Sequence, residues 1–279
     1  MSLSSSELDR YCQRIGMSAP LRRDAATLHG LHHLHPLAIP FENLDSWLGR
    51  EVSLDPAAVF AKLVDGRRGG YCFEQNLLFR EVLESLGFAV QGLAARVVWN
   101  LPAGVSLPRT HMLLLVTLDD TRFVADVGFG GLTLTAPLLL DSSAVQQTPH
   151  ESARLVHDGS HYILQAEVGG AWQALYRFGL DEQTSADYAM ANYFVSTHAQ
   201  SRFVQQLIAG RPGPALRHAL LDGRYSRHYL GKPSEQRQLT EAAGLRAVLQ
   251  HDLGIELGAL PELDRKIATL FTSTQGSER

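Results

Sequence analysis

Apolar residues recur every three or four positions through the first ninety residues, which is the spacing of amphipathic helices. Leu28, Leu31 and Leu34 follow this spacing. We expect their helix to stop before Pro36, because proline cannot donate the next helical hydrogen bond. A second run with the same spacing extends over residues 72–86. The N-terminal part of the chain is therefore predicted to be helical.

After residue 87 the pattern changes to short apolar runs that are rich in aromatic and β-branched residues. Asp-Asp, Gly-Gly or Asp-Gly pairs separate several of these runs, as in antiparallel strands joined by tight turns. The runs lie at residues 89–100, 111–118, 121–129, 161–168 and 172–178. They predict an antiparallel sheet or a small barrel over about residues 88–180.

The last third of the chain combines both patterns. Residues 196–210 indicate a capped helix, residues 218–231 a β-hairpin, and residues 234–257 a further helix. A mixed α+β fold is predicted from these three regions together.

The composition is that of an ordinary globular protein, with 45% hydrophobic and 19% charged residues. The formal net charge of −4 lacks the basic excess of a nucleic-acid-binding protein. The sequence contains no apolar run of eighteen residues and no basic, then apolar, N-terminal signal, so we expect no membrane span and no export. Its two cysteines, Cys12 and Cys72, cannot form a disulfide framework. We therefore expect a soluble cytoplasmic protein with free thiols.

Cys72 stands directly after a Gly69–Gly70 turn, at the start of a predicted helix. A cysteine reacts as its thiolate, which a helix N-terminus and a nearby histidine both favour. Free N–H groups of the first helical turn would also suit an oxyanion. Most lone cysteines are nevertheless inert packing residues. The local sequence leaves both interpretations of Cys72 open.

His111 is the histidine best placed to act as a base, because it opens a predicted strand. Asp126 follows one hairpin later, at the end of the next strand. A carboxylate there could accept the His111 Nδ1–H, which would fix the ring tautomer. A surface histidine and a turn-forming aspartate fit the same spacing equally well.

A second group of histidines shares one predicted helix. His29, His32, His33 and His35 lack the cysteine or carboxylate partners that would complete a tetrahedral metal site. We interpret them as surface or packing residues, and we expect no metal.

Several short motifs together resemble the arylamine N-acetyltransferase family, in the same order and with similar spacing. They are LHHLH at 31–35, IPFENLD at 39–45, RGGYCFEQN at 68–76, ARVVW at 95–99, THM at 110–112, DVGFG at 126–130 and, more weakly, STHAQSRF at 196–203. The resemblance covers roughly the first two hundred residues. It implies an α+β fold with an N-terminal helical domain (1–87), a central antiparallel β-barrel (88–191) and a C-terminal α/β lid (192–279).

The same resemblance implies a catalytic triad of Cys72, His111 and Asp126. It implies ping-pong transfer of an acetyl group from acetyl-coenzyme A to arylamines, arylhydrazines or N-hydroxyarylamines, as in xenobiotic metabolism, without a metal. A transglutaminase-like thiol hydrolase would use the same order of triad residues. An amide synthase of the same fold, which releases an arylamine-started polyketide, would use the same triad. We expect a monomer or a homodimer.

Further roles follow for individual residues. The resemblance places four side chains near the acceptor ring: Phe41, Val97, Phe129 and Phe203. We expect coenzyme A to contact Trp99, Thr110, Gly128, Gly130 and Gly131. The resemblance also implies an architectural ion pair between Glu42 and Arg68.

Overall fold

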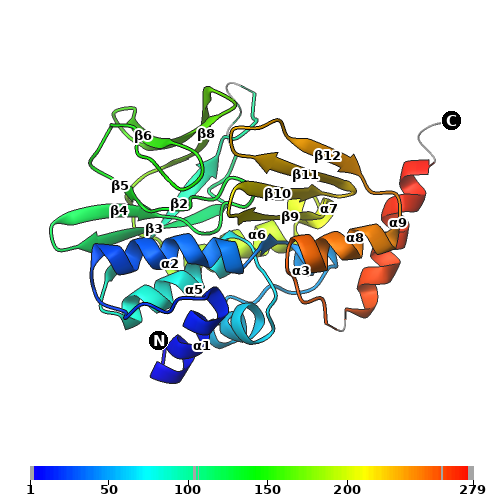
Figure 1. Cartoon of the computed structure of the whole chain (residues 1–279), viewed down its shortest axis with the longest axis horizontal. Helices are drawn as coiled ribbons and strands as arrows, with labels where there is room; N and C mark the ends of the chain where they lie inside the picture. The colour runs from blue at the N-terminus through cyan, green and yellow to red at the C-terminus, as the bar shows by residue number, and fades with distance from the viewer. Residues whose placement is uncertain (1–2, 103–104, 106, 259, 276–279) are drawn as a thin grey trace.

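The computed structural model describes residues 3–102, 105, 107–258 and 260–275 (Figure 1). The N-terminal elements are α1 (Ser5–Ile15), α2 (Ala25–Ala38), β1 (Phe41–Glu42), α3 (Leu44–Trp47), α4 (Pro56–Phe60), the π-helical turn η1 (Ala61–Asp65) and α5 (Cys72–Ser85). The central elements are β2 (Ala89–Val97), β3 (His111–Leu118), β4 (Thr121–Ala125), β5 (Leu138–Leu139), β6 (Ala153–His157), β7 (Tyr162–Val168), β8 (Ala171–Phe178) and α6 (Ser185–Thr197). The C-terminal elements are α7 (Arg202–Gln205), β9 (Ile208–Gly213), β10 (Leu216–Leu221), β11 (Arg224–Tyr229), β12 (Glu235–Gln238), α8 (Ala242–Ala247), the π-helical turn η2 (Val248–Asp252) and α9 (Pro261–Gln275).

The central strands form a nearly closed antiparallel barrel in the order β5-β4-β3-β2-β8-β7-β6. Gln146 bridges the two edge strands. Its side-chain oxygen accepts the Leu139 N–H of β5 at 2.8 Å, and its amide nitrogen donates to the Leu139 carbonyl at 3.0 Å. The main chain of Gln146 pairs in both directions with Ala153 of β6. The predicted barrel and the α+β class are confirmed.

Strand β3 is buried on both faces, which explains its continuous apolar sequence. Met112 and Leu114 pack into the core that β3 shares with the N-terminal helices. Leu113 and Leu115 point the other way, into the barrel interior. The helix α5 packs against β3 and β2. The first residue of α5 therefore lies beside the barrel wall.

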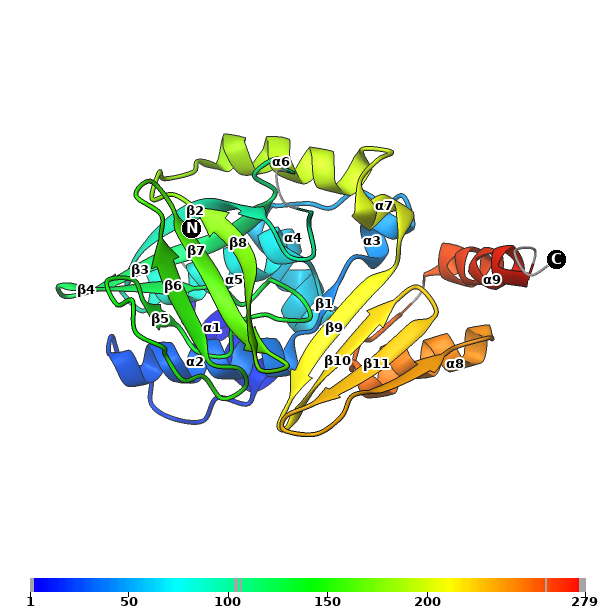
Figure 2. The ribbon, with the colours of Figure 1, turned by 90° about the horizontal axis from the view of Figure 1, so that it is seen from above.

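The C-terminal sheet has the order β1-β9-β10-β11-β12. Its apolar face packs against α3, α8, η2 and α9. Figure 2 shows this sheet beside the barrel, with α6 along the barrel and α7 leading from α6 into β9. Its first strand comes from the N-terminal region, since Phe41 pairs with Gly210 and Glu42 with Ala209. The predicted boundary between residues 191 and 192 falls inside α6.

The helix α2 does not stop before Pro36, as the sequence predicted, but continues to Ala38. The Ile39 N–H still reaches the His35 carbonyl oxygen at 2.8 Å, so the last turn closes beyond the proline. His35 and Pro36 are both buried. Packing of this turn against the core outweighs the hydrogen bond that proline removes.

Two predicted helices in the last third were wrong in part. Within residues 196–210, only α7 and the last two residues of α6 are helical, and β9 begins at Ile208. Within residues 234–257, helix is confined to α8 and η2, because Glu235–Gln238 pairs with β11 as a fully exposed edge strand. The predicted hairpin at 218–231 is confirmed by β10 and β11.

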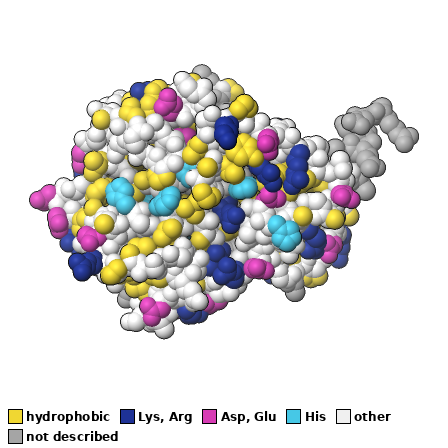
Figure 3. All heavy atoms as spheres, in the orientation of Figure 1, with side chains coloured by type: hydrophobic (Ala, Val, Ile, Leu, Met, Phe, Trp, Pro, Cys, Tyr) yellow, Lys and Arg dark blue, Asp and Glu magenta, His cyan; other side chains and the backbone are white. Residues whose placement is uncertain are grey.

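The described part of the chain contains no helix that is long and apolar enough to cross a membrane. On the face shown in Figure 3, Lys and Arg side chains alternate with Asp and Glu side chains, without a continuous basic area.

Candidate active site

Cys72 is the first residue of α5 and follows an extended segment, in which Gly70 forms a β-bridge with Phe41 and Tyr71 is extended, so the sharp glycine turn expected from the sequence is not present. A β-carbon on Gly69 would lie 2.2 Å from the Pro40 carbonyl oxygen, and one on Gly70 would lie 2.6 Å from Oε2 of Glu74. Both distances are too short for any side chain. The two glycines therefore let the chain pass close to its neighbours and begin the helix at Cys72.

His111 and Asp126 form a buried pair beside this cysteine. His111 Nε2 lies 2.7 Å from Asp126 Oδ2, and the Cys72 side chain is close enough to His111 to interact with it electrostatically. The sequence prediction that Asp126 would accept from Nδ1 was wrong, because the imidazole presents Nε2 to the carboxylate. Cys72 and His111 are 3% exposed, and Asp126 is fully buried.

The electrostatics favour a charged pair. Burial lowers the pKa of His111, but the Asp126 charge, the hydrogen bond to Asp126 and the interaction with Cys72 outweigh it and raise the pKa to about 10. Burial likewise opposes ionisation of Asp126, yet His111 and hydrogen bonds from Gly128 and Asn76 hold its pKa below the usual value. At neutral pH the imidazole thus carries a proton on both nitrogens. The Cys72 side chain lies beside this charged pair.

Asn76 connects the three elements that carry the candidate triad, and the sequence analysis did not identify it. Its amide nitrogen donates to Asp126 Oδ1 at 3.0 Å and to the Met112 carbonyl oxygen at 2.8 Å. Its side-chain oxygen accepts the Val127 N–H at 3.1 Å. Asn76 lies four residues after Cys72, on the same helix face, and this spacing was a usable signal.

Two aromatic rings flank His111. The Tyr176 ring centroid lies 4.9 Å from the imidazole, and the Phe129 centroid lies 5.1 Å from it. Tyr176 is fully buried, and burial together with the Asp126 charge raises its pKa well above the usual value. The phenol therefore stays neutral beside the carboxylate. Tyr176 is a second site residue that the sequence analysis missed.

The four predicted acceptor residues fall into two groups. Phe129 lies against His111, and Val97 pairs with Tyr176 across β2 and β8. The Phe203 ring lies 5.8 Å from that of Phe41 and 5.5 Å from that of Tyr71, the residue before Cys72. The first group thus adjoins His111, and the second adjoins the segment that leads into Cys72.

Gly128, Gly130 and Gly131, which were predicted to contact coenzyme A, already make contacts within the protein. The Gly128 N–H donates to Asp126 Oδ1 at 2.9 Å. Gly130 has a φ of 87°, and a β-carbon there would touch the Phe41 ring at 3.4 Å. The Gly131 carbonyl accepts from the buried Arg217 side chain at 3.3 Å. This turn is held from both the barrel and the C-terminal sheet.

Thr110 and Trp99 were also predicted to contact coenzyme A. The Thr110 carbonyl oxygen lies 3.6 Å from Cys72 Sγ, so Thr110 is adjacent to the sulfur. The Trp99 side chain packs at the edge of the barrel core, and the Trp99 main-chain N–H donates to the Leu175 carbonyl oxygen at 3.1 Å. Among the described residues, no group of three His, Cys, Asp or Glu side chains is arranged to hold a metal ion.

The predicted ion pair between Glu42 and Arg68 is confirmed, at 2.8 Å, within a larger buried network. Lys62 Nζ lies 2.6 Å from both Asp45 Oδ2 and Glu74 Oε1. Burial lowers the pKa of Lys62, but the surrounding carboxylates more than offset it and raise the value. The network supports the segment that leads into Cys72.

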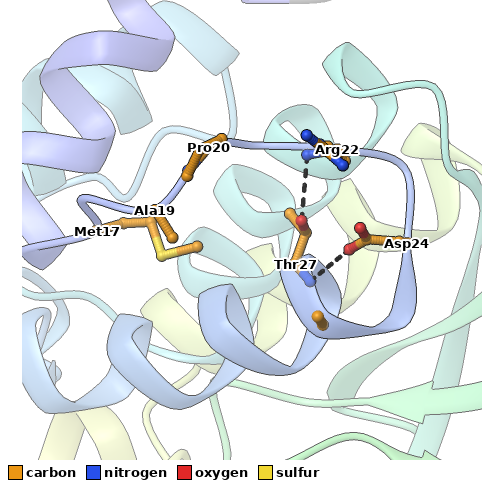
Figure 4. Close-up of a pocket in the computed structure, with 7 residues that line it drawn as sticks. Met17, Ala19, Pro20, Arg22, Asp24 and Thr27 are labelled. Atoms are coloured by element: carbon orange, nitrogen blue, oxygen red, sulfur yellow. Dashed lines mark hydrogen bonds between the residues drawn. The ribbon is translucent and has the colours of Figure 1, made fainter.

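A hollow of about 310 Å³ lies elsewhere, on the connection between α1 and α2 (Figure 4). Its lining is Met17, Ala19, Pro20, Arg22, Asp24, Ala26 and Thr27. Asp24 Oδ1 accepts the Thr27 N–H, and Thr27 Oγ1 accepts the Arg22 N–H, so these polar groups already have partners (Figure 4). It contains none of the predicted site residues. Cys72 is only 3% exposed, so the side chains that cover it must move before a substrate can reach it.

Comparisons with known proteins show the family to which this chain belongs. A family model described as N-acetyltransferase matches residues 24–261. An arylamine N-acetyltransferase from Escherichia coli strain K12 is 45% identical over 249 residues, which cover 89% of this chain and 88% of the relative. An arylamine N-acetyltransferase / N-hydroxyarylamine O-acetyltransferase from Salmonella typhimurium is 42% identical, covering 88% of this chain and 85% of the relative.

Solved structures of related enzymes superpose closely on the structure of this chain. The Mycobacterium smegmatis arylamine N-acetyltransferase has a TM-score of 0.91 at 39% identity, over 95% of this chain and 98% of that one. The Mycobacterium marinum enzyme in complex with CoA has a TM-score of 0.90 at 38% identity, over 94% of this chain and 99% of that one.

Proposed function

This chain belongs to the arylamine N-acetyltransferase family and transfers acetyl groups to arylamines; from this premise we propose that Cys72 carries the acetyl group between two half-reactions. The proposal rests on one observation: His111 interacts with both Asp126 and the Cys72 side chain, and its Nε2 lies 2.7 Å from Asp126 Oδ2. The same three residue types perform nucleophilic acyl transfer in other folds.

In the first half-reaction, the Cys72 thiolate attacks the carbonyl carbon of acetyl-coenzyme A. The new bond joins Cys72 Sγ to the acetyl carbon, and the bond between that carbon and the coenzyme A sulfur breaks. Coenzyme A leaves with a proton from His111. One thioester replaces another, so the acetyl group stays activated on the enzyme. Free N–H groups in the first turn of α5 would stabilise the negative oxygen of the intermediate.

In the second half-reaction, the amine nitrogen of the acceptor attacks the acetyl-cysteine. The C–N bond forms, the C–S bond breaks, and His111 receives the proton that the nitrogen loses. An arylamine is largely unprotonated at neutral pH, whereas an aliphatic amine is mostly an ammonium ion without a free lone pair. Formation of an amide from a thioester is downhill and drives this step.

The acceptor ring is proposed to lie between Phe129 and the pair of Phe41 and Phe203, with Val97 beside it. Apolar walls would also exclude water, which competes for the acetyl group. Arylhydrazines and N-hydroxyarylamines are further acceptors in this proposal. The O-acetylation named for the Salmonella relative supports the second of these.

Coenzyme A is proposed to pass Thr110 and Trp99 and to follow the glycine turn from Gly128 to Gly131. The complex of the Mycobacterium marinum relative with CoA supports this choice of donor. We propose a metal-independent enzyme of the cytoplasm, with a role in xenobiotic metabolism, where acetyl-coenzyme A is available and thiols remain reduced. It would act as a monomer or homodimer.

Mass spectrometry after mixing the protein with acetyl-coenzyme A tests the proposal. We expect one added acetyl group, on the peptide that contains Cys72, and its removal when an arylamine is added. Cys12→Ser should not change the result, and Cys72→Ser should remove the adduct. Peptide cleavage without an adduct would indicate a thiol hydrolase. An adduct that no simple arylamine or hydrazine removes would indicate an amide synthase.

A further inference from the structure

A histidine outside the candidate triad contacts the main chain of Asp126. His32 lies on α2 and is fully buried. Its Nε2 accepts the Asp126 N–H at 3.0 Å. The Phe79 ring of α5 stands at 88° to the imidazole, with the two centroids 5.7 Å apart. Neighbours on both sides thus fix the orientation of His32.

The contact defines the protonation of His32. A main-chain N–H can only donate, so Nε2 must carry no proton, and the neutral ring holds its proton on Nδ1. Burial lowers the pKa of His32, the Asp126 charge opposes this, His35 and His29 add to the lowering, and the resulting pKa is about 3. His32 therefore remains an acceptor throughout the neutral range.

The position of Asp126 in the sheet explains why this acceptor matters. The ladder between β3 and β4 ends at the pair of Leu114 and Ala125, so the Asp126 N–H lies just beyond it. The Asp126 side chain is held by His111, Asn76 and the Gly128 N–H. Those contacts orient the carboxylate, whereas His32 ties the main chain of the same residue to α2.

We propose that His32 is a positioning residue for acyl transfer, which fixes the main chain of Asp126 so that its carboxylate meets His111. This inference rests on the proposed function of the triad. The groups that face His111 are Asp126 after β4, Cys72 of α5, Tyr176 of β8 and the Phe129 ring. A shift of Asp126 would change the charge balance of the Cys72–His111 pair directly.

Two variants separate hydrogen bonding from ring packing. His32→Phe keeps an aromatic ring but offers no acceptor, and His32→Gln keeps an acceptor at a similar reach. His29→Phe is the matched control, because this ring lies on the same helix against Phe123, away from the triad. For each variant, the rate of Cys72 acetylation by acetyl-coenzyme A and the pH profile of Cys72 alkylation by iodoacetamide would be measured.

We expect His32→Phe to slow acetylation by about 10- to 100-fold, the size of effect that a displacement near 1 Å produces. We also expect it to shift the pH profile of alkylation. His32→Gln should restore most of both, and His29→Phe should match the unmodified protein. A folded His32→Phe protein with an unchanged rate and profile would overturn the inference.

If His32→Phe does not fold, His32→Gln and His32→Asn give the same comparison, because the shorter asparagine cannot reach the Asp126 N–H. Equal profiles for these two variants would reject the role of the acceptor. Failure of the unmodified protein to acquire an acetyl group on Cys72 would reject the proposed function itself. The two failures are therefore distinguishable.

Discussion

Gly128 lies directly against Cys72. A β-carbon at position 128 would be 2.8 Å from the Cys72 Cα and 3.2 Å from its carbonyl oxygen. The same glycine donates its N–H to Asp126. The turn that follows Asp126 and the start of α5 therefore fit together only while residue 128 has no side chain.

We expect Gly128→Ala to separate Cys72 from the His111–Asp126 pair and to lower the acetylation rate by about 10²-fold, since small displacements in a site have this effect. A single-turnover measurement of coenzyme A release would show it. Gly179→Ala is the control, because a β-carbon there meets its nearest atom at an ordinary 3.5 Å. Equal rates for both variants would show that the contact with Cys72 is not limiting.

Cys72→Ser should abolish turnover, because a hydroxyl beside His111 ionises far less readily than a thiol. The assay is steady-state acetylation of an arylamine with acetyl-coenzyme A. Cys12→Ser should retain full activity, since Cys12 lies on α1 among packing residues. Residual turnover by Cys72→Ser near the normal rate would exclude this nucleophile.

Asp126→Asn should slow the enzyme by about 10³- to 10⁴-fold, because an amide can hold the wrong imidazole tautomer and no longer balances the imidazolium. The structure adds a second effect. Removal of one partner from a buried ion pair costs about 3–5 kcal/mol of folding free energy. Rates and urea unfolding would be measured on the same sample. A near-normal rate would leave Asp126 as a turn residue only.

Stability should fall on both sides of about pH 6.5, the ordinary pKa of histidine in an unfolded chain. The folded-state pKa values of His32 and His35 are lowered to about 3 and about 4 by burial. Between these values and pH 6.5 these two histidines bind two more protons in the unfolded chain than in the folded one, so their contribution to stability falls by up to about 2.7 kcal/mol for each unit of acidification. The pKa of His111 is raised to about 10, so its contribution is complete below pH 6.5 and is lost as the pH rises toward 10.

Urea midpoints measured from pH 4 to pH 10 would test this dependence. His35→Gln should reduce the acid slope by about one proton, or about 1.4 kcal/mol per pH unit, because one buried neutral histidine is removed. An unchanged acid slope in this variant would contradict the assignment.

Lys62→Met should destabilise the protein by about 3–5 kcal/mol, because it leaves the buried carboxylates of Asp45 and Glu74 without their shared cation. Arg246→Met is a comparable change in a pair whose partner, Asp264, is 70% exposed, and it should cost no more than about 1 kcal/mol. Urea unfolding compares the two. Similar losses would mean that the Lys62 network is as weak as a surface pair.

Local patterns predicted the elements whose neighbours lie close in the chain. The hairpin of β10 and β11 was identifiable because its Asp-Gly turn and flanking strands are adjacent. Strands β1 and β12 were not, because each depends on a partner strand that local spacing does not reveal. The prediction that α2 would stop before Pro36 failed for a related reason, because the packing that keeps this turn helical comes from other elements.

In the candidate site, too, the features that depend on residues distant in the chain could not be predicted from the sequence. A pair of glycines before Cys72 and strand positions for His111 and Asp126 are visible in the sequence, and the structure brings the three side chains together. His32 acts through the main-chain N–H of Asp126, which no residue-type pattern can indicate. The ring nitrogen that meets the carboxylate likewise depends on the register of β3 and on the turn after β4.

The strand β1 lies between the segment before Cys72, which contains Gly70, and the strand β9 of the C-terminal sheet. Phe41 bridges Gly70 on one side and pairs with Gly210 of β9 on the other. A ribosome makes β1 early and β9 only after most of the chain has emerged. Until β9 has been made, β1 of a nascent chain has no partner on the side of the C-terminal sheet, so premature termination before β9 would leave Phe41 and Glu42 unpaired on that side.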